Sequence, residues 1–174
     1  IELQTYLGQK VTIPLSKISS INYATANIKW LSELEVLEAV ADKRFSFRSN
    51  VSGLDRAMAP RFIANKGPTA IANSGDKDLY FPSPGRFVFR APEGFSSFQS
   101  QVLRTDEGNQ RSDLTIEVWQ DDQRIAGLPL PFDQDSIEIN VSVQAGKKIR
   151  LAVAGGSKLM VGTEVQWKQP RLKR

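Results

Sequence analysis

The chain has 174 residues, and its content of 40% hydrophobic and 24% charged residues is typical of one globular domain of ordinary size. It contains no cysteine and no histidine, which excludes a disulfide framework, zinc sites built on these residues, and catalysis by a histidine base or a cysteine nucleophile. The 23 basic and 19 acidic residues are interspersed and the apolar runs are short, so we expect neither a nucleic-acid partner nor insertion into a membrane.

The first 27 residues predict a β-hairpin extension. The segments IELQTYL (1–7) and KVTIPL (10–15) fit two strands that turn at Gly8 and Gln9. Such a hairpin can add a strand to a neighbouring molecule or cover a sheet of its own domain, so self-association is one expected behaviour.

The stretch WLSELEVLEAVADK (30–43) fits two structures equally well. Four apolar residues recur at helical spacing: Leu31, Leu34, Leu37 and Ala41. Ser32 followed by Glu35 fits a capping box, so one short helix near residues 32–41 is one prediction. The same stretch from Trp30 to Val36 also fits an extended strand, and both alternatives stay open.

Short strands separated by turns dominate the rest of the chain. Alternation of apolar and polar residues predicts strands at 86–91, 95–103, 136–143 and 147–153, and two strands within 114–130 that are joined by a polar turn at 120–123. The clearest case is SIEINVSV (136–143), in which every second residue is Ile or Val. Clusters of Gly, Pro, Asp and Asn lie between the strands. We therefore predict an all-β fold, an antiparallel β-sandwich of the jelly-roll type.

The three tryptophans differ in their predicted surroundings. Trp119 falls on the polar face of its strand, beside Glu117. An indole there either binds a sugar ring or a protein partner, or is covered by the N-terminal segment of the same chain. Trp30 and Trp167 each follow an aliphatic residue by two positions, which predicts that both lie in the core.

Over roughly residues 28–172, the order of short motifs resembles the NPCBM family of carbohydrate-binding modules. The matching residues are Lys66-Gly67, Arg86-Phe87, Asp106, Val118 with Asp121-Asp122, Gly146 with Ile149-Arg150-Leu151, and Trp167 with Leu172. The resemblance implies a galactose-binding-domain-like jelly roll that binds carbohydrate or tethers a larger, multi-domain, secreted bacterial protein, without catalysis. Two family motifs are absent, at 67–71 and 162–166. Their absence favours the alternative of a structural or assembly domain that holds a protein partner outside the cell.

The predicted ligand site combines one aromatic platform with a few polar groups from loops, as sugar sites do. Its residues are Trp119, Arg104, Asp106, Asn109 and Arg111. No cofactor is expected. A calcium ion held by Asp106, Glu107 and Asn109, or by Asp133 with Asp135, is the one alternative, without the spacing of a defined calcium loop.

The predicted organisation is a hairpin extension (1–27), an NPCBM-like sandwich (28–172) and a basic tail (173–174). No nucleophile elbow, phosphate-binding loop or dinucleotide motif is present, and the acidic residues fall in turns, so we expect no enzyme activity. The expected location is secreted, periplasmic or at the cell surface, and the expected partner is a carbohydrate or a surface protein.

Overall fold

The fold consists of strands packed in layers, seen in a computed structural model that describes residues 2–4, 9–12, 14, 16, 27–41, 59–62, 77–82, 84–105, 113–155 and 164–174. A five-stranded sheet has the order β10-β9-β12-β7-β4. Its strands are β4 (Val36–Ala41), β7 (Gly85–Arg90), β9 (Leu114–Gln120), β10 (Gln123–Leu130) and β12 (Lys148–Gly155). Every neighbouring pair in this sheet is antiparallel.

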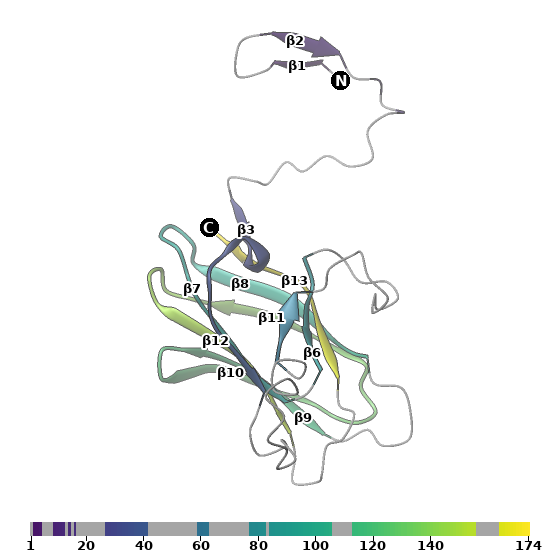
Figure 1. Cartoon of the computed structure of the whole chain (residues 1–174), viewed down its shortest axis with the longest axis vertical. Helices are drawn as coiled ribbons and strands as arrows, with labels where there is room; N and C mark the ends of the chain where they lie inside the picture. The colour runs from purple at the N-terminus through teal and green to yellow at the C-terminus, as the bar shows by residue number, and fades with distance from the viewer. Residues whose placement is uncertain are drawn as a thin grey trace.

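The second layer is a six-stranded antiparallel sheet (Figure 1). Along its main path, β11-β8-β13-β6-β5, lie β11 (Ser136–Ser142), β8 (Ser97–Arg104), β13 (Val165–Lys173), β6 (Leu79–Phe81) and β5 (Arg61–Phe62). The short strand β3 (Ile28–Trp30) pairs with the C-terminal half of β13. Two antiparallel sheets facing one another confirm the predicted β-sandwich.

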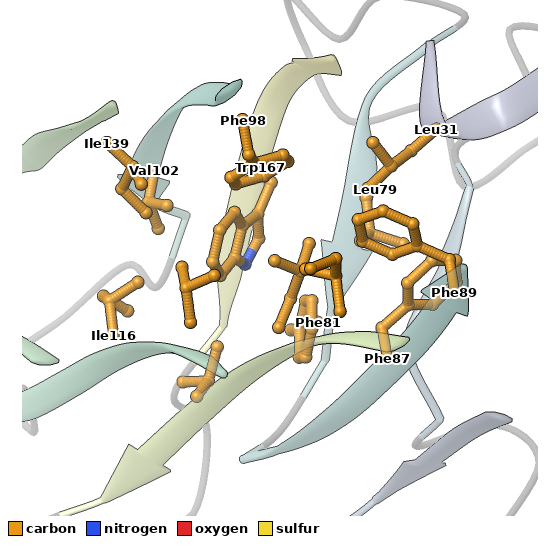
Figure 2. Packing of buried hydrophobic residues seen from close by; sticks show 14 of the residues in the cluster. Leu31, Leu79, Phe81, Phe87, Phe89, Phe98, Val102, Ile116, Ile139 and Trp167 are labelled. Carbon is orange, nitrogen blue, oxygen red and sulfur yellow. The ribbon is translucent and has the colours of Figure 1, made fainter. Parts of the chain in front are cut away.

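The core lies between the two sheets and follows the predicted alternation. On β8, Phe98 and Val102 are fully buried, and on β12, Ile149 and Leu151 are fully buried. Figure 2 shows Trp167 of β13 at the centre of this core, which confirms its predicted position. Its ring centroid lies 5.9 Å from that of Phe81 and 6.2 Å from that of Phe98.

The described part of the ambiguous stretch, residues 30–41, is a strand over just more than half of its length. A single 3-10 turn, η2 (Leu31–Glu33), comes first, and β4 then pairs with β7. The helical spacing of the leucines is overridden because only Leu31 is fully buried in the core, whereas Leu37 is 41% exposed. The helix near residues 32–41 is therefore replaced by a turn and an edge strand.

The two ends of the chain have separate arrangements. Near the N-terminus, β1 (Glu2–Gln4) pairs antiparallel with β2 (Lys10–Thr12) in a sheet of their own, and both strands lie within the segments expected to form the hairpin. At the C-terminus, the expected basic tail is part of the sandwich: Lys173 ends β13, and the backbone N–H of Arg174 donates to the carbonyl of Asn27 at 3.1 Å. Within the described ranges, no helix is long and apolar enough to cross a membrane.

Candidate functional site

A polar groove of about 340 Å³ crosses the outward face of the six-stranded sheet, and we call it the amide groove. Its lining residues are Gln99, Ser100, Gln101, Glu138, Ile139, Asn140, Lys168, Gln169 and Arg171. They come from three adjacent strands, β11, β8 and β13. The groove is therefore built on the sheet itself.

Strand alternation and register place the groove's side chains in rows. Because Phe98 and Val102 of β8 point into the core, Gln99 and Gln101 point outward. The pairing of β8 with β11 and β13 then makes two rows of outward neighbours, Glu138–Gln101–Lys168 and Asn140–Gln99–Arg171. Directly opposed residues on neighbouring strands have Cβ atoms about 5 Å apart, so each row presents a nearly continuous line of polar groups.

A bulge in β13 puts two cations on the same face of the sheet. Lys168 and Arg171 are three positions apart, and a regular strand would point them to opposite faces. They pair with Gln101 and Gln99, which are only two positions apart, so β13 carries one extra residue between them. This bulge aims both side chains at the amide groove.

The bulge is held by Asp78, a fully buried carboxylate. Asp78 accepts hydrogen bonds from Gln166 Nε2 at 2.7 Å, Lys168 Nζ at 3.1 Å and the backbone N–H of Gln169 at 2.8 Å. Gln169 has a positive φ of 43°, a conformation that such bonds help to maintain. Asp78 thus neutralises Lys168 and fixes the backbone that carries the cationic side of the groove.

Trp30 extends the second row of the groove. The prediction that Trp30 lies in the core is therefore wrong. In the pairing of β3 with β13, Trp30 lies opposite Arg171, an outward residue, so the indole shares the outward face. Trp30 is half-buried, with Lys77 Nζ 4.4 Å and Arg171 Cζ 5.8 Å from its ring centroid. Alternation alone placed Ile28 and Trp30 on one face but could not say which face meets the core.

Several polar groups of the groove remain available to a ligand. Gln99 Nε2 donates to Asn140 Oδ1 at 3.3 Å, which orders these two amides relative to each other. Within the described part of the chain, the side chains of Gln101 and Glu138 make no hydrogen bond or ion pair. A ligand in the groove therefore meets free amide and carboxylate groups beside two cations.

Trp119 lies on the outward face of the opposite, five-stranded sheet, on the polar side of β9 as predicted. Its Nε1 donates to Glu117 Oε2 at 2.9 Å. The guanidinium of Arg150, which is opposite Trp119 on β12, lies 4.3 Å from the indole centroid. Glu117 also pairs with Arg124 at 3.2 Å. The indole is therefore covered and hydrogen-bonded by neighbouring side chains of its own sheet.

Beyond Trp119, the same face carries a groove of about 630 Å³ in which two of the carboxylates are ion-paired. It is lined by Leu37, Glu38, Val88, Asp121, Asp122, Lys148 and Arg150, without Trp119. Glu38 pairs with Arg86, and Asp121 pairs with Lys147 at 3.0 Å. The hydrogen bond from Lys147, with a further bond from the backbone of Lys148, lowers the pKa of Asp121 below its ordinary value.

Arg104, predicted to bind ligand, points between the sheets and is 8% exposed. Its guanidinium donates to the carbonyls of Leu130 at 2.7 Å, Pro131 at 3.1 Å and Gln134 at 3.2 Å. It therefore fastens the loop after β10, and the structure does not bring it together with Trp119. The other predicted site residues, Asp106, Asn109 and Arg111, lie outside the described residues.

Only two of the candidate calcium ligands are among the described residues. Asp133 and Asp135 are both exposed, whereas Asp106, Glu107 and Asn109 lie outside the described ranges. No group of three or more acidic residues that could hold a metal gathers in the part of the chain that the structure describes. Calcium binding stays an untested prediction.

Comparison with known proteins identifies the fold but not the family. No protein-family model matches the chain, and no curated protein matches its sequence. Among solved structures, CBM51 from a Clostridium perfringens GH95 protein, in complex with methyl-galactose, is similar with a TM-score of 0.56 and 18% identity, over 84% of this chain and 99% of that one. The tandem CBM51 modules of a family 98 glycoside hydrolase from Streptococcus pneumoniae are similar with a TM-score of 0.60 and 15% identity, over 94% of this chain and 52% of that one.

A third similar structure joins an M60 catalytic domain to two CBM51 domains from Clostridium perfringens ZmpB. Its TM-score is 0.58 at 17% identity, and the match covers 84% of this chain but 15% of that one. The chain thus spans only a small part of the length of that solved structure. These likenesses establish a shared β-sandwich fold, and the NPCBM resemblance remains a prediction.

Proposed function

We propose that this protein is a non-catalytic carbohydrate-binding module that holds its ligand in the amide groove. The observation that carries the proposal is the pair of outward rows across β11, β8 and β13, the second of which ends at Trp30. The fold it shares with CBM51 modules, one of them in complex with methyl-galactose, supports the same assignment.

The chemistry of the groove suits sugar hydroxyls. Each hydroxyl is both a donor and an acceptor, and the amides of Gln99, Gln101 and Asn140 offer both functions in a planar arrangement. Trp30 adds an aromatic edge beside Arg171, and an indole packs on the C–H face of a sugar ring. The volume of about 340 Å³ lies at the small end of ligand sites, which fits one or two sugar units.

The groove lacks the arrangement that glycoside hydrolysis requires. That reaction uses two carboxyl groups that flank the scissile bond. Of the groove's lining residues, Glu138 is the only carboxylate, and the nearby Asp78 is fully buried and accepts hydrogen bonds from three donors. Binding without catalysis is therefore the function that these residues favour, and the expected place of action is outside the cell or at its surface.

A glycan array probed with the full chain tests this proposal. We expect binding by the wild type, loss of binding by a Gln99→Ala, Gln101→Ala double variant, and retention of binding by Trp119→Ala. Loss in Trp119→Ala alone would instead place the site on the five-stranded sheet. A blank array with folded protein would contradict carbohydrate binding.

A second candidate function is assembly with a protein partner through β4. This strand ends the five-stranded sheet, and its residues Val36 and Leu37 are 42% and 41% exposed. An edge strand with exposed apolar side chains can pair with another chain. Light scattering after gel filtration would detect self-association, which a Leu37→Lys variant should weaken.

A further inference from the structure

The amide groove has ends of opposite charge. Lys168 is neutralised by the buried Asp78, which leaves Arg171 and Glu138 as the charged groups that face a ligand. Arg171 pairs with no carboxylate in the described residues, and its one hydrogen bond is a long one, 3.5 Å from Nη1 to the carbonyl of Gln169. Its positive charge is thus left for a ligand.

A second cation reinforces the Arg171 end. Lys77 Nζ lies 4.4 Å from the centroid of the Trp30 ring, over which Arg171 also lies. Lys77 has Glu33 as an ion-pair partner at 3.8 Å, a loose contact between partly exposed groups. One guanidinium and one ammonium group near the same indole make this end of the groove attractive to an anion.

Glu138 sets the polarity of the groove. It lies on the other row and two strands away from Arg171. With strands about 4.8 Å apart and about 3.4 Å per residue, the backbone positions of the two residues are roughly 12 Å apart. An anionic ligand group at Arg171 is therefore well separated from the Glu138 carboxylate, while the amides between them face the sugar ring.

We infer that the amide groove prefers sugars that carry a carboxylate, and that Arg171 binds this carboxylate at the Trp30 end. The inference deepens the proposed function and rests on it. The planar guanidinium of Arg171 matches a planar carboxylate through two parallel N–H···O bonds, and one guanidinium balances one negative charge. The remaining hydroxyls of the sugar face Gln99, Gln101 and Asn140.

Calorimetric titration of the full chain with two matched sugar pairs tests the inference. The probes are the methyl glycosides of galactose and of galacturonic acid, and those of glucose and of glucuronic acid, which within each pair differ only at C6. We expect at least one uronate to bind about tenfold more tightly than its neutral partner at 50 mM salt, with the preference reduced at 300 mM salt because the contact is only partly buried.

Substitution of Arg171 identifies the group responsible. Arg171→Gln should remove the uronate preference, so that the acidic and neutral partners of a pair bind equally, whereas Arg171→Lys, which keeps the charge but not the fork, should retain part of the preference. Arg90→Gln, on the five-stranded sheet, is the matched control and should retain all of it. Circular dichroism establishes that each variant is folded.

The outcomes separate this inference from the proposed function. Equal binding of neutral and acidic partners, or a preference that survives in Arg171→Gln, would overturn the inference and leave carbohydrate binding in place. Tighter binding of methyl galactoside 6-sulfate than of the galacturonide would overturn the choice of a carboxylate. Binding of none of the probes would overturn both.

Discussion

The two outward faces of the sandwich use similar side chains in different ways. On the five-stranded sheet the charges around Trp119 and along β4 are paired: Arg86 pairs with Glu38, and Arg124 pairs with Glu117. Trp119 belongs to this network through its bond to Glu117. On the six-stranded sheet a row of amides lies open in a groove. Arg171, which has no ion-pair partner among the described residues, lies at the end of this groove beside Trp30.

An outward tryptophan is therefore not enough to identify a binding site. Trp119 and Trp30 both lie on the polar face of a strand, and both have a cation over the ring. What separates them is the surrounding polar groups, which are paired around Trp119 and partly unpaired around Trp30. A ligand gains most where it replaces water on groups that have no partner in the protein.

The largest effect is expected at Asp78, the buried carboxylate that holds the bulge of β13. It is compared with an exposed ion pair on the other face of the sandwich. Asp78→Ala leaves Lys168 and the buried Gln166 without their acceptor, so we expect a loss of about 3–5 kcal/mol in the free energy of unfolding. Glu38→Ala removes an exposed pair with Arg86 and should cost about 1 kcal/mol or less. Urea denaturation measures both, and equal losses would contradict the contrast.

A second prediction concerns Arg104, which belongs to neither outward face. Arg104→Met removes the donors to three loop carbonyls, and bonds from charged groups are worth about 1.5–3 kcal/mol, so we expect a loss of stability of that order. Sugar affinity should stay within about twofold of the wild type. Weakened binding in a variant that remains folded would restore Arg104 to the ligand site.

The third prediction compares the two tryptophans directly. Trp30→Ala should weaken sugar binding about tenfold, equivalent to about 1.4 kcal/mol, because it removes the aromatic edge of the amide groove. Trp119→Ala should change the affinity by less than about twofold, since its ring is engaged with Arg150. Calorimetry on both variants decides between the faces, and the reverse order would move the site to the five-stranded sheet.

The smallest expected effect is a pH dependence on the five-stranded face. The pKa of Asp121 is lowered in the folded protein, first by the hydrogen bond from Lys147, so its ionised form is favoured by folding. The resulting stability is present above the ordinary value of 3.8 and is lost as the pH falls through the lower, folded pKa. Asp121→Asn should therefore shift the urea midpoint slightly at pH 7 and not at pH 2. A difference that grows at low pH would contradict this.

Much of the fold could be predicted from alternation. The strands around Phe98, Ile139, Leu151 and Val118 were recognisable because one face of each is apolar, and all four residues are buried as expected. The helical alternative for residues 32–41 was wrong because periodicity in a short stretch does not reveal its pairing partner. Here β7 supplies a hydrogen-bonding edge, and the stretch became a strand.

The candidate site was harder to predict. Gln99, Gln101 and Asn140 were visible as the polar half of two strands, but nothing local indicated that those strands are neighbours. The bulge that turns Arg171 to the same face as Lys168 also has no clear local signal, since it depends on a buried carboxylate far away in the chain. Trp30 was assigned to the core because alternation specifies a shared face without its direction.

On most strands, the order of residues is enough to specify which side chains face inward, because burying the apolar half of each alternating segment removes it from water. Which outward side chains meet depends on how the strands pair in the folded protein. Strands β3, β8, β11 and β13 are far apart in the chain, and their registers follow from hydrogen-bond ladders formed when the sheet assembles. The amide groove is a product of that register.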